Sequence, residues 1–85
     1  MSHKIASHVA WQDVDGEAVI VDLDSGVSIG LNRTATFVWK NLEQFDDAEL
    51  VSRTAAEFDV DRDTAAEDVR AFVEEIERRR LVERQ

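Results

Sequence analysis

The chain has 85 residues, a formal net charge of −9 and no cysteine. This length favours one small domain, and a binding module over an enzyme with a deep pocket. The acidic charge argues against nucleic acid and anionic membranes as partners, and the lack of cysteine excludes disulfides and thiolate metal sites in this chain. No stretch has the pattern of a membrane span or a signal peptide, so we expect a cytoplasmic protein.

The first third of the chain predicts a three-stranded antiparallel meander. Residues 1–4 are expected to be a frayed end, and a first strand falls within residues 5–14, best defined at 8–12. Asp15-Gly16 then predicts a hairpin turn into a second strand at 17–23. Because residues 18–21 are apolar on both faces, we expect this strand to be central and covered on both sides. A second turn at 24–26 leads to the third strand.

The third strand, residues 27–31, is an edge of the predicted meander. Its apolar residues Val27, Ile29 and Leu31 alternate with Ser28 and Gly30. Small residues on one face leave room for another chain to approach, and an open edge offers unpaired N–H and C=O groups.

Three helices follow. Asn32 is the expected cap of a first helix at 33–42, and Asp46 with Glu49 predicts a capping box for a second helix that ends before Asp59. The third helix begins at Asp63 or Thr64 and runs to Arg80. Its apolar positions recur at helical spacing: Ala65, Ala66, Val69, Phe72, Val73 and Ile76. With residues 81–82 folding back onto the core, the fold class is α+β, a three-stranded meander followed by three helices.

Aromatic side chains divide into two groups. Trp11 in the first strand and Trp39 on the apolar face of the first helix are expected in the core. Phe37 falls off the apolar stripe of that helix, so it either packs on a second face or is partly exposed.

Several acidic and histidine residues invite a metal or catalytic interpretation. In Asp59-x-Asp61-x-Asp63, an EF-hand loop would need Gly where Thr64 stands and Glu where Arg70 stands, so these acids are expected to be caps and turn residues. Asp22 and Asp24, beside Gly26, are likewise expected to stabilise a turn and not to bind a metal. His3, predicted to be disordered, and His8, predicted to be a strand residue, lack suitably spaced partners. We therefore predict no metal, no cofactor and no catalytic residue.

The order of these motifs resembles the PqqD-like family, the precursor-peptide recognition domains of ribosomally made, post-translationally modified peptides. The resemblance covers nearly the whole chain through the pieces V-I-V-D-L-D-S-G at 19–26, V-S-I-G-L-N at 27–32, T-A-T-F-V-W at 34–39, D-D-A-E-L-V at 46–51, F-D-V-D at 58–61 and D-V-R-A-F-V-E-E-I at 68–76. The most specific pieces are Leu31-Asn32, Trp39 and Asp68-Val69. The chain departs from the family where Glu43-Gln44 replaces a common Gly and where Arg80 replaces the Gly of a common Gly-Leu-Ile ending.

The resemblance implies a winged-helix-like domain without enzymatic activity. It implies that the leader of a precursor peptide adds as a strand beside the third strand, in a cleft with the third helix. The bound peptide is then presented to a modifying enzyme, often a radical S-adenosylmethionine protein. From their spacing we expect Val69 and Val73 to floor the cleft and Arg70 to pair with an acidic leader residue. The predicted peptide-binding residues are Val27, Ser28, Ile29, Gly30, Leu31, Val69, Arg70 and Val73.

Two other function classes compete with peptide binding. A protein–protein adaptor or a homodimer could form through the edge strand without any peptide ligand. A winged-helix nucleic-acid binder would need a basic recognition helix, whereas the third helix is rich in Asp and Glu. A small enzyme is the class with the least support.

Overall fold

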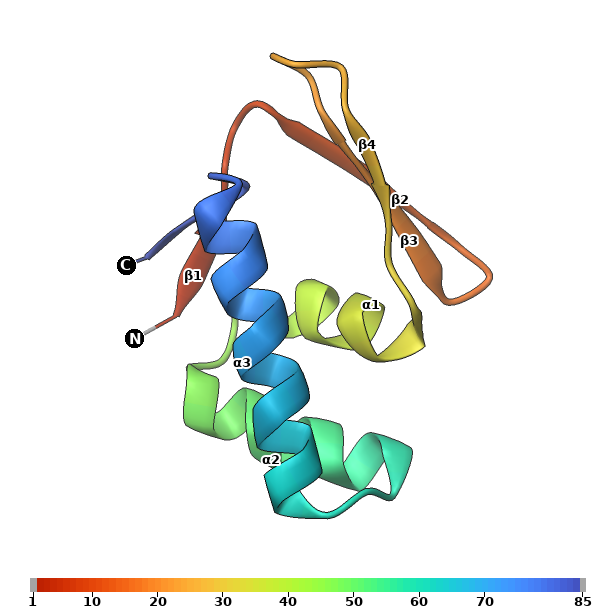
Figure 1. Cartoon of the computed structure of the whole chain (residues 1–85), viewed down its shortest axis with the longest axis vertical. Coiled ribbons are helices and arrows are strands. Elements are labelled where there is room, and N and C mark those ends of the chain that lie inside the picture. The colour runs from red at the N-terminus through yellow and green to blue at the C-terminus, as the bar shows by residue number, and fades with distance from the viewer. Residues whose placement is uncertain (1, 85) are drawn as a thin grey trace.

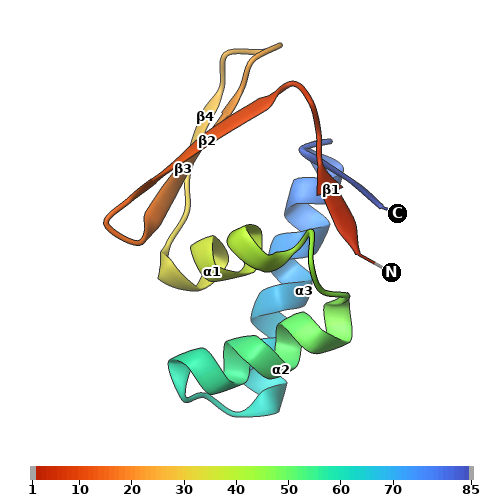
Figure 2. The same ribbon diagram turned by 180° about the vertical axis from the view of Figure 1, so that it is seen from behind.

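The computed structural model describes residues 2–84 and confirms the α+β fold (Figure 1). Its strands are β1 (His3–Ile5), β2 (Val9–Val14), β3 (Glu17–Asp22), β4 (Ser28–Gly30) and β5 (Val82–Arg84), and its helices are α1 (Arg33–Asn41), α2 (Asp47–Phe58) and α3 (Arg62–Arg78). Figures 1 and 2 show the sheet of β2, β3 and β4 packed to one side of the helices, and the β1–β5 ribbon across α3 from it. Within residues 2–84, none of the helices has the length and apolar character needed to cross a membrane.

The meander has the predicted strand order β2-β3-β4, so β3 is central and β4 is an edge. Asp15 (φ 55°) and Gly16 (φ 85°) both adopt the left-handed conformation between the paired residues Val14 and Glu17. Two consecutive positive φ angles are the signature of the tight hairpin turn that matches strand twist. The Asp15-Gly16 prediction is therefore confirmed.

Only one face of the sheet is covered by helices. In β3, Ala18 and Ile20 are buried, whereas Val19 is 38% exposed. The prediction that both faces of this strand would be covered was wrong, because the alternation of side chains sends Val19 to the face without a helix. Trp11 lies opposite Ile20 on the covered face, yet it is 39% exposed and packs edge-to-face on buried Trp39 at the boundary of the core.

Each helix begins at a side-chain cap. Asn32 Oδ1 accepts the Ala35 N–H at 2.8 Å, and Asp46 Oδ1 accepts the Glu49 N–H at 2.9 Å, as predicted. The Glu49 carboxylate pairs with Arg53, and no bond from the Asp46 N–H back to it is found within residues 2–84, so only the Asp46 half of the predicted capping box forms. In α3 the cap is Asp61, so this helix begins at Arg62 and ends at Arg78, slightly earlier at both ends than predicted.

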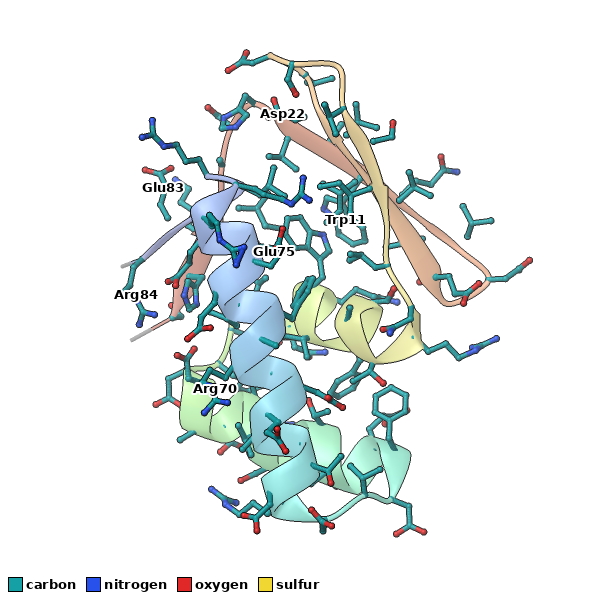
Figure 3. The ribbon with its side chains drawn as sticks, in the orientation of Figure 1. Trp11, Asp22, Arg70, Glu75, Glu83 and Arg84 are labelled. Atoms are coloured by element: carbon teal, nitrogen blue, oxygen red, sulfur yellow. The ribbon has the colours of Figure 1, made fainter. Side chains whose placement is uncertain are left out.

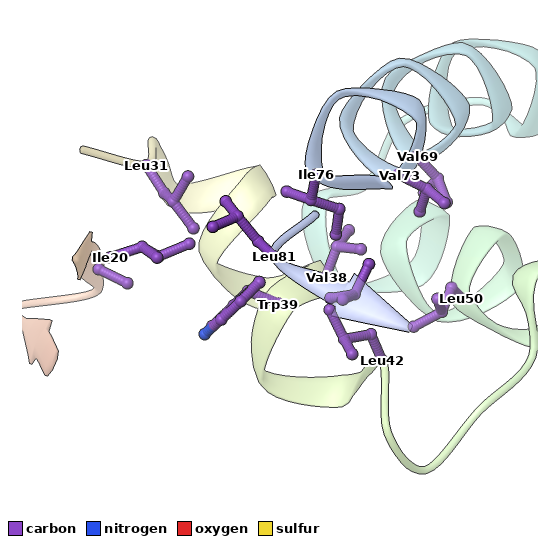
Figure 4. Close-up of a cluster of buried hydrophobic side chains, with 12 residues drawn as sticks. Ile20, Leu31, Val38, Trp39, Leu42, Leu50, Val69, Val73, Ile76 and Leu81 are labelled. Carbon is purple, nitrogen blue, oxygen red and sulfur yellow. The ribbon is translucent and has the colours of Figure 1, made fainter. Parts of the chain in front are cut away.

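The core fills the space between the sheet and α1, α2 and α3 (Figure 4). Every helix contributes to it, and the turn after α3 adds Leu81, which confirms that this segment folds back. Phe37 packs edge-to-face on Phe58 of α2 and remains half-buried, so it forms a second packing face of α1. The largest buried side chains include Trp39, Ile20, Leu42, Leu50 and Leu81.

The start of the chain is not frayed within the described residues. β1 pairs antiparallel with β5, and the His3 N–H donates to the Leu42 carbonyl at 3.2 Å. The His3 ring is fully buried, with Nε2 2.9 Å from Glu77 Oε2. Burial opposes ionisation of Glu77, but its bonds to His3 and Arg84 outweigh this effect and lower its pKa. The predictions that residues 3 and 4 are frayed and that His3 is disordered were wrong. Met1 lies outside the described residues.

Candidate functional site

The backbone of β4 presents an open edge. The Leu31 N–H donates to the Ala18 carbonyl at 2.8 Å, and the Asp22 N–H donates to the Val27 carbonyl at 2.9 Å. In an antiparallel pair, successive residues turn their N–H and C=O groups alternately toward and away from the partner strand. The groups of Ser28 and Gly30 therefore point away from β3, toward the open side of the sheet.

The side chains of Ile29 and Leu31 anchor this edge without covering it. Leu31 is buried, and Ile29 is half-buried opposite Ile20. Gly30 is exposed, and a Cβ built on it would meet no atom within 4 Å. The structure thus places Ser28, Ile29 and Gly30 in β4, with Val27 and Leu31 on either side of a strand that is shorter than predicted, rooted in the core and open on one side.

A hollow of about 330 Å³ lies between α1 and α3, starting at Asn32 just beyond the end of β4. Its floor is apolar, because Val38 is buried and Ala35 and Phe72 pack against the core. Its rim carries two carboxylates. The lining residues are Asn32, Thr34, Ala35, Val38, Asp68, Ala71, Phe72 and Glu75.

The other three predicted site residues lie elsewhere. Val69 and Val73 are buried, and with Arg70 they line a separate hollow of about 420 Å³ bounded by α2, α3 and β5. Figure 3 shows Arg70 on the side of α3 away from the sheet and Glu75 on the side facing it. The structure does not bring Arg70 together with the open edge of β4.

Sequence reasoning did not name Asp68 and Phe72 as site residues, although both line the hollow that begins at Asn32. They are four positions apart, so they lie on one side of the helix. The apolar stripe of α3 contained Phe72, but a stripe does not reveal which neighbouring element covers each of its margins.

Comparison with known proteins places the chain in a family. The family model for coenzyme PQQ synthesis protein D (PqqD) matches residues 17–82. The chain belongs to the PqqD family. This confirms the family predicted from its motifs. Among curated proteins, no sequence matched this PqqD-family chain.

Two solved structures resemble the PqqD-family chain closely. TbiB1 in complex with the TbiA(beta) leader peptide is 31% identical, with a TM-score of 0.85 over 96% of each chain. Lasso peptide synthetase B1 complexed with the leader peptide is 23% identical, with a TM-score of 0.83 over 96% of this chain and 98% of that one. The similarity to lasso peptide synthetase B1, at this low identity, shows a shared fold only.

Of the two carboxylates at the rim of the hollow, one forms ion pairs with arginines and the other, within the described residues, does not. Glu75 binds Arg78 at 2.6 Å and also binds Arg79. The hydrogen bond from Arg79 lowers the pKa of Glu75 below its usual range. Asp68 is exposed and takes part in none of the ion pairs found within residues 2–84. The hollow between α1 and α3 therefore has one carboxylate that is paired with arginines, Glu75, and one that is not paired in the described part of the chain, Asp68.

A second cluster of titratable groups lies at the β3–β4 turn. Ligand atoms of His8, Asp22 and Asp24 lie within 4.8 Å of one another. Asp22 Oδ1 accepts the N–H groups of Asp24 at 2.9 Å and Ser25 at 3.3 Å, which confirms the predicted turn chemistry. Burial opposes ionisation of Asp22, but these amide bonds outweigh it and lower its pKa. His8 lies in the turn before β2, and not in a strand as predicted.

Proposed function

We propose that this PqqD-family chain binds the leader segment of a ribosomally made precursor peptide as a further strand beside β4. The observation that carries the proposal is the open edge at Ser28 and Gly30, next to a hollow with an apolar floor. In strand addition, main-chain hydrogen bonds supply affinity and hollows for alternate side chains supply specificity. The complex of TbiB1, 31% identical to this chain, with a leader peptide supports the proposal.

The bound leader is held for a separate modifying enzyme, and the chain itself is not a catalyst. The family resemblance suggests a radical S-adenosylmethionine protein as that enzyme. In this proposal residues 27–31 pair with the leader. Val69 and Val73 contribute indirectly, because they pack α3 onto the core. Phe72 takes the floor position that spacing alone assigns to Val69 and Val73. The acidic surface of α3 favours a peptide over nucleic acid as the partner.

The test is an amide-resolved NMR titration of the labelled protein. The probes are the TbiA(beta) leader peptide and the leader of any short precursor encoded beside this gene. We expect shifts concentrated at residues 27–31 and at 68–75 of α3. A well-folded spectrum that neither peptide perturbs in these segments would contradict the proposal.

A matched pair of variants at Gly30 isolates the backbone contact. Gly30→Pro removes the outward N–H, whereas Gly30→Ala keeps it and adds a Cβ in open space. Losing one net hydrogen bond of about 0.5–1.5 kcal/mol weakens binding about two- to tenfold. We expect this loss for the proline variant and near-unchanged affinity for the alanine variant. Equal affinities of the two folded variants would place the peptide elsewhere.

A homodimer through the same edge is the second candidate, because the unpaired groups of Ser28 and Gly30 fit any extended strand, including a second copy of β4. Sedimentation at increasing protein concentration distinguishes the two candidates. A dimer that the leader peptide does not dissociate would favour the adaptor function.

A further inference from the structure

We infer that the leader segment accepted by this site carries a lysine or arginine that pairs with Asp68, beside an apolar side chain seated over Phe72. This inference rests on the proposed function and specifies its ligand. It reverses the sign of the charge expected from the sequence, where Arg70 was assigned an acidic leader residue. The reversal follows from the position of Arg70 in the α2–α3–β5 hollow.

The open edge of β4 and the Asp68 hollow follow one another along the chain. Asn32, which lines the hollow between α1 and α3, comes two residues after Gly30. An extended chain advances about 3.3 Å per residue. A peptide paired with Gly30 therefore reaches the rim of the Asp68 hollow within about two or three residues.

The floor of the hollow suits an apolar side chain. Phe72 is half-buried and packs against the core, and Val38 beneath it is 1% exposed. Seating a leader side chain there would remove the exposed part of Phe72 from water, which stabilises the complex. Asn32 and Thr34 at the other margin are uncharged, so the charge preference comes from α3.

The open charge at this hollow is Asp68. Glu75 is already compensated by Arg78 and Arg79, whereas Asp68 is exposed and forms none of the ion pairs within the described part of the chain. Asp68 lies one helical turn before Phe72, so a basic leader side chain can reach it while a separate apolar side chain lies over Phe72. The net charge of −9 adds a long-range attraction for basic segments.

The expected effect is modest because the pair is exposed to water. An ion pair of this kind changes affinity by about two- to fivefold, and the difference shrinks at high salt. Selection from a peptide library detects such a small charge preference better than the affinity of a single peptide does, because it measures which residues are enriched at every position of the peptide.

The experiment selects a displayed library of random 12-residue peptides on the wild type, on Asp68→Lys and on Glu67→Lys. The last variant makes the same charge change at the neighbouring exposed residue, which does not line the hollow. We expect wild type and Glu67→Lys to enrich Lys or Arg at one position, two residues from an apolar residue, because alternate side chains of an extended chain share a face. Asp68→Lys should instead enrich Asp or Glu at that position.

The outcomes separate the two proposals. Peptides that shift residues 27–31 in NMR spectra but show the same charge preference in all three selections would overturn the Asp68 inference and leave the proposed function standing. An equal change of preference in both lysine variants would assign the effect to net charge and would also overturn it. A selection that yields no peptide perturbing residues 27–31 would overturn the proposed function, and the inference with it.

Discussion

Thr36 connects α1 to the sheet through one buried hydrogen bond. Its Oγ1 accepts the Ala18 N–H at 2.8 Å, and the two residues are 3% and 1% exposed. Ala18 in turn accepts the Leu31 N–H, so this contact fixes the end of β4 relative to α1. Thr36→Val keeps the shape of the side chain and leaves the Ala18 N–H buried without a partner. The expected cost is about 1–3 kcal/mol, and each kcal/mol lowers the Tm of a domain this small by about 4–8 °C.

Urea unfolding followed by tryptophan fluorescence measures this cost, because Trp39 is buried in the folded protein. Thr36→Ser is the matched control: it keeps the acceptor and loses one methyl group, at a cost of about 1 kcal/mol. We expect the serine variant to be more stable than the valine variant, although valine is the more apolar residue. A valine variant as stable as the wild type would refute the reasoning.

Three further predictions concern the ends of the helices and the start of the chain. Asp59→Gly should stabilise the fold by about 0.5–1 kcal/mol in urea unfolding, because Asp59 ends α2 with φ 52° and places a negative charge at a helix C-terminus; a destabilised variant would contradict this. His3→Ala should lower the free energy of unfolding by about 2–4 kcal/mol, since it empties a buried site and removes a partner of Glu77; unchanged stability would contradict a stabilising role for the His3 side chain. The hydrogen bond from the Thr64 N–H lowers the pKa of Asp61 below its usual range in the folded state. The stability that ionised Asp61 contributes is therefore fully present above the unfolded pKa and is lost as the pH falls through the folded pKa. Asp61→Asn, which keeps a capping oxygen, should therefore show a shallower loss of stability between about pH 5 and 2 than the wild type, and identical slopes would disprove this role.

Features with local causes could be predicted from the sequence. Asn32 and Asp46 cap their helices by bonding an N–H three residues later, and Asp15-Gly16 forms a turn through its own φ angles. Each depends on a few consecutive residues. The meander, its β4 edge and the three helices follow from such signals together with apolar periodicity.

Features that depend on distant partners could not be predicted. β1 was assigned to a frayed end because its partner, β5, lies at the other end of the sequence. The exposure of Val19 depends on the helices covering one face of the sheet and not the other. Arg70 and Asp68 are two positions apart on α3, and only the packing of α1 and α2 on either side shows which of them lines the hollow that begins at Asn32.

The β1–β5 ribbon has a consequence for modularity. Residues 3–5 and 82–84 lie side by side, so the described chain leaves the fold close to where it enters it. Figures 1 and 2 place both ends across α3 from β4. A domain with adjacent ends can be spliced into a surface loop of another protein, or joined to one at either end, with little distortion of host or guest. This geometry lets the β4 edge remain open in a fused protein, provided that the fusion partner extends away from it.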